Sequence, residues 1–176
     1  MKELTTERLL LRAVTREDTQ AIFDNWASDN EVSKYLTWPA HQTIADTGAI
    51  MEFWLAEYEK DDCRRYGIER REDGMLMGMI DVVGYRDGAP VIGYCSGRAF
   101  WGKGYMTEAL GAVVNELFDA GYEKIILEAI VENIGSCRVA EKAGFVRTGC
   151  RRSILSRFKP YEVILNTYML EKRAER

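Results

Sequence analysis

The sequence predicts an α/β fold of the α+β kind, in which a mixed, mostly antiparallel central sheet is covered by helices on both faces. The first half alternates strand-like runs with tight turns at Asp73-Gly74 and Arg86-Asp87-Gly88, which is typical of an antiparallel meander. The second half alternates helical and strand-like segments. The chain has 176 residues and shows no linker or repeat, so we expect a single domain over residues 1–176.

Two capping boxes mark helix starts in the first half, where a Thr is followed three residues later by an Asp. They are Thr15 with Asp18 and Thr43 with Asp46. Helical spacing predicts that the second of these helices buries one apolar side, made of Ile50, Phe53, Trp54 and Tyr58. The elements expected here are a strand over 8–14, helices over 15–27 and 43–60, and strands over 65–69, 75–85 and 90–96.

The second half is expected to add two helices and three strands. Apolar residues recur at helical spacing over 102–120, and Gly121 follows as a C-terminal cap, so a helix is predicted there. The remaining elements are a strand over 124–131, a helix over 136–143 that Gly144 ends, and strands over 145–148 and 162–170.

Charge and cysteine content argue against several classes of protein. The formal net charge is −4, whereas nucleic-acid binding needs a basic surface that neutralises phosphates. Four cysteines and the single His41 show no metal-ligand spacing, so no metal site is expected. No apolar run approaches the roughly 20 residues that span a bilayer, and no secretory signal is evident. We therefore expect a cytoplasmic protein with free thiols and no membrane or nucleic-acid partner.

The strongest local motif is Trp101–Ala109, WGKGYMTEA, between a strand-like and a helical segment. Glycines let a backbone approach a ligand closely, and the amides of a first helical turn attract anions. A phosphate or pyrophosphate is the natural ligand, with Lys103 adding charge at the rim. The alternative is that the glycines only shape a turn. A dinucleotide-binding motif fits poorly, because Thr107 stands where a small packing residue is expected and the segment follows a meander.

A second motif spans Asn133–Phe145, NIGSCRVAEKAGF, after the next strand-like run. Asn133 follows the strand, and Ser136 is placed to start a helix. Each residue also has a purely structural interpretation, with Asn133 and Ser136 as turn and N-cap residues and Lys142 as a helix-end charge. Taken alone, this motif leaves the function open.

Together, in this order and about thirty residues apart, the two motifs resemble the GNAT acyltransferase family. The resemblance extends to Val32–Pro39, to His41 and to the Ile92-Gly93-Tyr94 run, which look like the branch that includes ribosomal-protein N-terminal acetyltransferases. It covers nearly the whole chain. It implies a GNAT fold and an N-acetyltransferase that moves an acetyl group from acetyl-CoA to a primary amine.

The resemblance also implies a binding site for acetyl-CoA that is built largely from backbone. The strand through Tyr94–Ser96 would run beside the pantetheine arm like an added strand, and the amides of Trp101–Met106 would hold the pyrophosphate. Asn133 would contact the pantetheine or orient a water, and Ser136 would lie near the sulfur. The cofactor-binding residues expected are Tyr94, Cys95, Ser96, Trp101, Gly102, Lys103, Gly104, Tyr105, Met106, Asn133 and Ser136, with Arg138 and Lys142 reaching the adenosine phosphates.

Two positions depart from the family pattern. Ala99 stands where Gln or Arg is frequent, three residues before the first glycine, which backbone amides can compensate. Ala140 stands where many members place a tyrosine, seven residues after the asparagine, as the acid for the leaving thiolate. Ser136 or a water is therefore the expected proton donor, with Asn133 as the other catalytic residue of this motif.

The implied reaction is direct attack of a neutral amine on the thioester carbonyl. An α-amine with a pKa near 8 is only about a tenth neutral at pH 7, so a base is useful. Asp81 is the expected base, because strand alternation places it opposite Ile80 and Val82. Glu69 and Glu128 are its rivals, and a structural role for Asp81 stays open.

A covalent route through a cysteine is less favoured. Cys95 and Cys137 have no histidine near them in the sequence that would make a thiolate, and inert packing is the usual role of such residues.

The acceptor side is expected around Trp38 and His41, in the N-terminal half. An aromatic wall beside a cationic amine fits this pair, whereas Trp26 and Trp54 are expected in the core. The acceptor is a protein N-terminus or a small amine. An antibiotic- or polyamine-modifying acetyltransferase and a non-catalytic acyl-CoA sensor are the alternatives, and a homodimer stays open.

Overall fold

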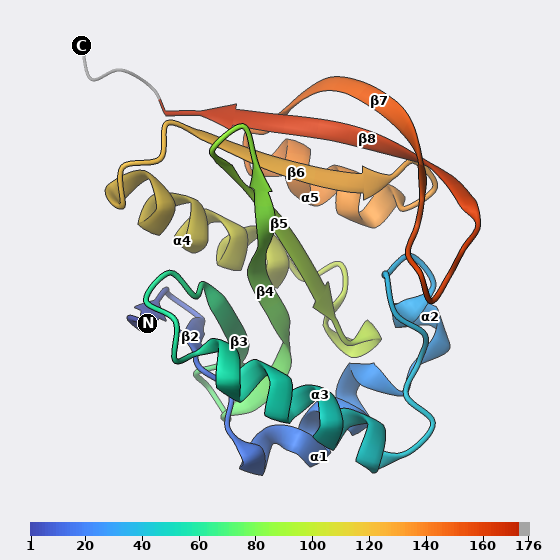
Figure 1. Cartoon of the computed structure of the whole chain (residues 1–176). Helices are drawn as coiled ribbons and strands as arrows, with labels where there is room; N and C mark the ends of the chain where they lie inside the picture. The colour runs from blue at the N-terminus through green and yellow to red at the C-terminus, as the bar shows by residue number, and fades with distance from the viewer. Residues whose placement is uncertain (173–176) are drawn as a thin grey trace.

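The computed structural model describes residues 1–172 and contains an eight-stranded sheet in the order β1-β2-β3-β4-β5-β6-β8-β7 (Figure 1). The strands are β1 (Leu4–Thr5), β2 (Leu9–Arg12), β3 (Arg65–Arg70), β4 (Met75–Arg86), β5 (Ala89–Ser96), β6 (Lys124–Ile130), β7 (Val146–Ile154) and β8 (Glu162–Glu171). The helices are α1 (Thr19–Ile22), α2 (Asn30–Ser33), α3 (Ile44–Glu57), α4 (Tyr105–Asp119) and α5 (Ile134–Lys142), with 3-10 turns η1 (Arg16–Asp18) and η3 (Arg98–Phe100) and a π-helix η2 (Phe23–Ala27).

The sheet is mixed and mostly antiparallel, as the sequence predicts. Every neighbouring pair of strands is antiparallel except β5 with β6. That parallel contact is short: Val91 and Ile92 pair with Ile126 and Leu127, whereas β5 continues to Ser96 and β6 to Ile130. Beyond the two pairs the strands diverge, as Figure 1 shows, and we call this opening the β5–β6 fork.

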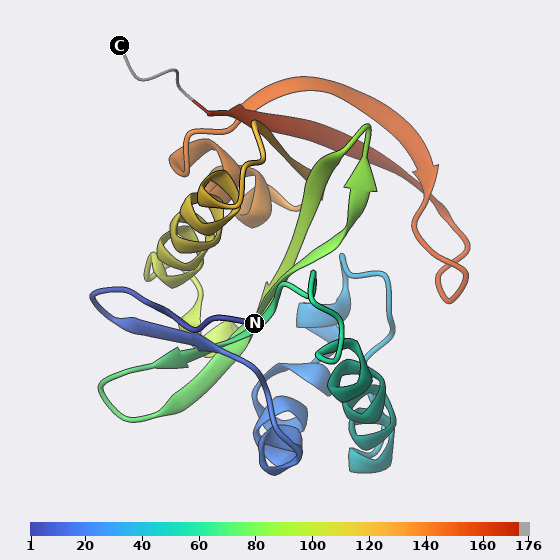
Figure 2. The same cartoon turned by 60° about the vertical axis from the view of Figure 1, so that its left-hand side comes forward.

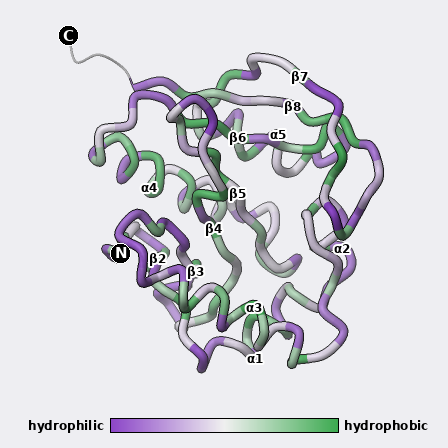
Figure 3. The backbone as a smooth tube through the Cα atoms, viewed as in Figure 1, coloured by the Kyte–Doolittle hydropathy of each residue, from purple (hydrophilic) through white to green (hydrophobic). Residues whose placement is uncertain are grey.

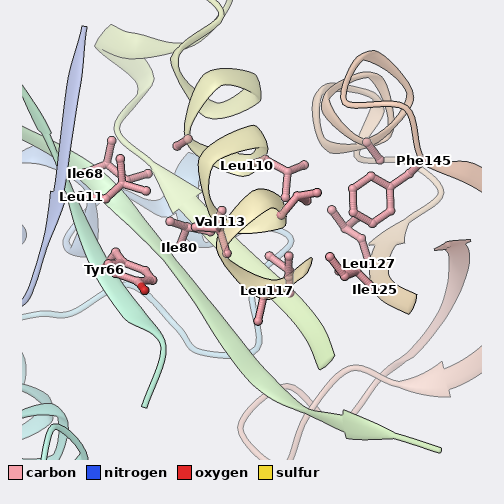
Figure 4. Packing of buried hydrophobic residues seen from close by; sticks show 14 of the residues in the cluster. Leu11, Tyr66, Ile68, Ile80, Leu110, Val113, Leu117, Ile125, Leu127 and Phe145 are labelled. Carbon is pink, nitrogen blue, oxygen red and sulfur yellow. The ribbon is translucent and has the colours of Figure 1, made fainter. Parts of the chain in front are cut away.

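Helices cover both faces of the sheet, and each face has its own core. The first core lies against α4 and α5 and the second against α1, η2 and α3 (Figure 2). α4 is the centre of the first core: Leu110, Val113 and Leu117 are fully buried, between Ile80 on β4 and Leu127 on β6 (Figure 4). The hydropathy of α4 follows the same pattern, with hydrophobic stretches separated by hydrophilic ones (Figure 3). Ile92 on β5 and Leu127 on β6 belong to the same core as α4, so this core includes both arms of the fork.

The first expected helix exists as a composite. A capping box joins Thr15 and Asp18 as predicted, and the chain then runs through η1, α1 and η2. The final turn is a π-turn, because the amide of Ser28 donates to the carbonyl of Phe23 five residues back, at 3.2 Å. The short elements β1, α2 and η3 have no counterpart in the sequence expectations.

The second capping box is also confirmed, since Thr43 caps α3 with Asp46. The expected apolar side of this helix is wrong at Phe53, whose side chain is 53% exposed. The buried side instead includes Thr47 and Met51. Hydrophobicity alone does not locate the buried side of α3, because Thr47 faces the core and Phe53 faces solvent.

Two helix starts differ from the expectation. α4 begins at Tyr105 rather than at residue 102, because Gly102 and Gly104 adopt positive φ angles of 73° and 82° and form a loop. α5 begins at Ile134 rather than at residue 136, because Asn133 is its N-cap. The first helical turn therefore begins at Tyr105 in α4 and at Ile134 in α5.

Candidate active site at the β5–β6 fork

The fork exposes backbone groups of β5 that no strand pairs. The amide of Gly97 donates to the carbonyl of Met77 at 2.9 Å, so alternate residues Gly97 and Cys95 direct their backbone groups toward β4. Tyr94 and Ser96 therefore direct theirs toward β6, which has already diverged. An extended ligand can add to this edge like a strand. Of the three expected residues Tyr94–Ser96, the first and last present their backbone to the fork, while the backbone of Cys95 faces away.

The loop before α4 presents free first-turn amides at the end of β5. Gly104 is the N-cap and has no side chain, and the first helical bond runs from the amide of Glu108 to the carbonyl of Gly104 at 3.1 Å. The amides of Tyr105–Thr107 precede that bond and have no partner inside the helix. Trp101 secures the loop to the strand, because its indole N–H donates to the carbonyl of Ser96 at 2.8 Å. The predicted phosphate site is thereby joined to the fork.

Arg8 supports this loop from the opposite end of the chain. Its guanidinium donates to the carbonyl of Lys103 at 3.1 Å and to the carboxylate of Glu108 at 2.6 Å, and it lies 4.5 Å from the centre of the Tyr105 ring. Thr6 donates to the same carboxylate at 2.6 Å. Sequence reasoning missed Arg8, and no local pattern could have revealed it, because its partners lie about a hundred residues away.

The start of α5 brings Asn133 and Ser136 to the other arm of the fork. The side-chain oxygen of Asn133 accepts a hydrogen bond from the amide of Ser136 at 3.2 Å, so Asn133 caps the helix and Ser136 does not. The Ser136 hydroxyl lies 3.0 Å from the hydroxyl of Tyr94, which also donates to the Ser136 carbonyl at 3.2 Å. Burial raises the pKa of Tyr94. The tyrosine hydroxyl was not foreseen as part of the site.

The three candidate bases all accept hydrogen bonds from arginine. Glu69 accepts from Arg12 at 2.6 Å, away from the fork on β3. Glu128 uses both oxygens, with Arg151 at 2.9 and 2.8 Å and Arg86 at 2.9 Å. This leaves neither carboxylate well placed to accept a proton from a substrate at the fork.

Asp81 is the candidate that lies next to the fork. Its Oδ2 contacts Arg65 at 3.0 Å, while Oδ1 faces Gly93 on β5, where an added Cβ would lie 3.8 Å from it. The side chain is 18% exposed, and burial raises the pKa of Asp81 against the opposing charge of Arg65. A carboxylate with a raised pKa and one oxygen outside its ion pair is suited to accept a proton.

The cysteines are poorly placed for nucleophilic chemistry. Burial, with the nearby charge of Asp81, raises the pKa of Cys95 to about 12, so the thiolate is scarce at neutral pH. Cys137 is buried and contacts the carbonyl of Ile130 and the amide of Asn166. Across residues 1–172, no group of three or more metal-ligating side chains comes together.

Trp38 and His41 form an aromatic pair before α3, with ring centroids 5.3 Å apart. His41 contacts the hydroxyl of Thr47 at 2.8 Å, and burial lowers the pKa of His41, which favours the neutral ring. The β7–β8 loop reaches this segment, because Ser156 donates to the carbonyl of Thr37 at 2.5 Å. Two chain segments distant in sequence therefore lie together at the expected acceptor side.

The predicted basic residues of the cofactor site are exposed. Lys103 lies in the loop before α4, and Arg138 and Lys142 lie one turn apart on α5. They share no contact that would assign them to one phosphate. Within the part of the chain that the structure describes, no helix is long and apolar enough to cross a membrane.

Comparisons with known proteins agree with this architecture. Residues 8–146 match the family described as the acetyltransferase (GNAT) domain. The chain is 30% identical over 176 residues to the N-acetyltransferase YoaA of Bacillus subtilis (strain 168), covering 98% of both chains.

Solved structures show the same fold. The microcin C7 self-immunity acetyltransferase MccE, in complex with acetyl-CoA and AMP, superimposes with a TM-score of 0.82 at 20% identity, over 95% of this chain and 94% of that one. The RimL ribosomal L7/L12 alpha-N-protein acetyltransferase in complex with coenzyme A gives 0.82 at 18% identity, over 97% and 98%. The family match, the full-length relative and the fork beside an amide loop together show that the chain is an N-acetyltransferase and belongs to the GNAT acetyltransferase family.

Proposed function

We propose that the chain is a single-domain N-acetyltransferase that takes its acetyl group from acetyl-CoA and transfers it to a primary amine. The observation that carries the proposal is the β5–β6 fork, where no strand pairs with the backbone of Tyr94 and Ser96 and β5 leads into the amide loop before α4. A chain of amides ending in a pyrophosphate is the ligand that matches such an edge and loop. The RimL and MccE structures, which contain coenzyme A or acetyl-CoA, support this choice of donor.

In this proposal the backbone of Tyr94 and Ser96 pairs with the pantetheine amides. The amides of Trp101–Met106 hold the pyrophosphate, and Asn133 and Ser136 lie beside the thioester at the far end. The exposed Lys103, Arg138 and Lys142 add positive charge around the phosphates. Acetyl-CoA supplies the activated acyl group.

The reaction we propose is direct attack by the amine. Its lone pair forms a C–N bond with the thioester carbonyl carbon, the C–S bond breaks, and the electron pair leaves with sulfur. Before the attack, Asp81 takes the proton that converts the ammonium form of the amine to the neutral amine, directly or through water, because its Oδ1 lies outside the Arg65 ion pair. The proton that the nitrogen sheds after the attack leaves to water. The high pKa of Cys95 and the buried position of Cys137 favour this route over an acyl-cysteine intermediate.

The acceptor is a protein N-terminus or a small amine. An α-amine needs less help from a base than a lysine amine does, because about a tenth of the α-amine is neutral at pH 7. The name of RimL favours a protein N-terminus, and the AMP bound to MccE favours a small-molecule acceptor. Trp38 and His41 would form the acceptor wall. The free cysteines fit a reducing cytoplasm, where we place the protein. The proposal allows the chain to act as a homodimer.

The proposal is tested by thiol release from acetyl-CoA with a panel of small amines and N-terminal peptides. We expect release above the buffer rate together with a product whose mass has increased by one acetyl group on nitrogen. EDTA should not change the rate, since no metal takes part in the proposed reaction. Absence of thiol release with every acceptor, or acetylation of hydroxyl groups only, would overturn the proposal.

Asp81 is tested as the base with Asp81→Asn, using Glu69→Gln as the matched control. We expect kcat to fall by about a hundredfold near pH 7, since general-base catalysis contributes roughly 10²–10⁴-fold. The loss should shrink as the pH rises above the amine pKa, because a neutral amine has no proton to lose before attack. A purely structural role for Asp81 predicts an equal loss at every pH.

A further inference from the structure

The leaving thiolate of the proposed reaction needs a proton, and α5 does not carry the usual donor. Ala140 stands at the helix position where many family members have a tyrosine, and it is fully buried. Ser136 lies one turn earlier on the same helix, so the two positions share a face. An aliphatic hydroxyl is by itself a weak acid, so Ser136 alone is a poor source of the proton.

A phenol reaches this position from the other arm of the fork. Tyr94 lies on β5, its ring packs against the core that contains Ala140, and its hydroxyl lies 3.0 Å from the hydroxyl of Ser136. The backbone of the same residue faces the open edge of the fork, because side chain and backbone of a strand point in perpendicular directions. Tyr94 therefore borders the fork with its backbone and contacts the Ser136 hydroxyl with its side chain.

We propose that Tyr94 is the proton source for the thiolate and acts through Ser136. As the C–S bond breaks, the sulfur takes the proton of the Ser136 hydroxyl, and the Ser136 oxygen takes the proton of the Tyr94 hydroxyl. The tyrosinate regains a proton from solvent after the products leave, which balances the proton taken from the amine. This inference rests on the proposed function.

The geometry of the two hydroxyls favours this relay. A tyrosine has an ordinary pKa of about 10, so a phenol is a far stronger acid than an aliphatic alcohol. Burial raises the pKa of Tyr94, so the hydroxyl is protonated at neutral pH and gives up its proton less readily, and the transfer depends on the direct 3.0 Å contact with Ser136. In this scheme Tyr94 is a positioning residue, because Ser136 is the group that contacts the sulfur.

The kinetic test uses Tyr94→Phe, Ser136→Ala and the double variant. We expect each single change to lower kcat by at least about tenfold while KM for acetyl-CoA stays nearly constant, and the double variant to lose little more than the worse single one. Tyr85→Phe is the matched control, because Tyr85 is exposed and its hydroxyl accepts a hydrogen bond only from the hydroxyl of Tyr122, at 3.3 Å. Normal turnover of Tyr94→Phe, or fully additive losses, would overturn the relay while leaving the acetyl transfer itself in place.

A second readout does not depend on turnover. Hydroxyl groups that can donate to sulfur stabilise the thiolate of bound CoA, so the thiol should titrate at a lower pH in the wild type than in Tyr94→Phe or Ser136→Ala. The thiolate is followed by ultraviolet absorbance, with desulfo-CoA as the blank that removes the tyrosine signal. Equal thiol pKa values in all three proteins would contradict the relay, even if the wild type transferred no acetyl group and the proposed function had failed.

Discussion

At the scale of single residues, Gly104 determines the shape of the proposed phosphate loop. Its φ of 82° lies in the left-handed region, which costs an L-residue roughly 1–2 kcal/mol. A Cβ at this position would also lie 3.5 Å from the Arg8 guanidinium, which secures the loop through Lys103 and Glu108. That distance is an ordinary contact, so the glycine is required by its backbone angle.

Gly104→Val should weaken the binding of CoA. The branched side chain disfavours the positive φ, so the first-turn amides of α4 move from the positions that hold the pyrophosphate. We expect the Kd measured by calorimetry to rise by about tenfold or more, which corresponds to roughly 1.4 kcal/mol. Gly88→Val is the matched control, because Gly88 has a similar φ of 79° in the β4–β5 turn and no atom within 4 Å of an added Cβ. Unchanged CoA affinity in a folded Gly104→Val protein would remove the loop from the site.

At the scale of elements, the start of α5 assigns the N-cap and the hydroxyl contact with Tyr94 to two different residues, which the sequence alone did not distinguish. Asn133 caps the helix through its side chain, and Ser136 contributes only its amide to that cap. The hydroxyl of Ser136 is thereby available for Tyr94. The stability of α5 and the proposed chemistry thus depend on different side chains.

Asn133→Ala should destabilise the protein by about 1 kcal/mol, the usual cost of losing an N-cap. The free energy of unfolding is measured by urea denaturation. Ser136→Ala is the comparison, since it keeps the cap and should cost less. If Asn133→Ala unfolds at the same urea concentration as the wild type, the cap is not the role of Asn133 in the folded protein.

At the scale of the whole molecule, Glu128 connects strands that are distant in the sequence. It lies on β6 and contacts Arg86 at the end of β4 and Arg151 on the outer strand β7, with 14% of its side chain exposed. Burial opposes ionisation, but the hydrogen bonds from Arg151 and Arg86 outweigh it and lower the pKa of Glu128. The group therefore stabilises the fold above its unfolded pKa of about 4.3, and this contribution is lost as the pH falls through the lower folded value.

Glu128→Gln should reduce the free energy of unfolding at pH 7 by roughly 1–3 kcal/mol, the range for hydrogen bonds to charged groups. The difference from the wild type should begin to shrink below the unfolded pKa of about 4.3 and disappear only below the lower folded pKa, where Glu128 is protonated in both states. Unfolding is followed by denaturation at several pH values. Glu162→Gln is the control, because its pair with Arg152 at 3.5 Å is largely exposed and should contribute little. A constant difference down to pH 3 would contradict the assignment.

The sequence by itself determined the fold class, the family and most elements of this protein. Capping boxes at Thr15 and Thr43, turns at Gly74 and Gly88, and the periodicity of α4 are local features, so they are visible within a few residues of chain. The family motifs are also local, and the match over residues 8–146 confirmed the family that they indicated. The features that could be predicted are therefore those that depend on residues close together in the sequence.

The tertiary structure decided which of these residues meet. The divergence of β5 from β6 after Ile92, the contact of Tyr94 with Ser136 across 42 residues, and the support of the α4 loop by Arg8 depend on how separate elements dock. The same is true of the ion pair with Arg65 that engages only Oδ2 of Asp81. Such contacts follow from the packing of the two cores around the sheet, and no local pattern carries that information, because the partners become neighbours only when the chain has folded.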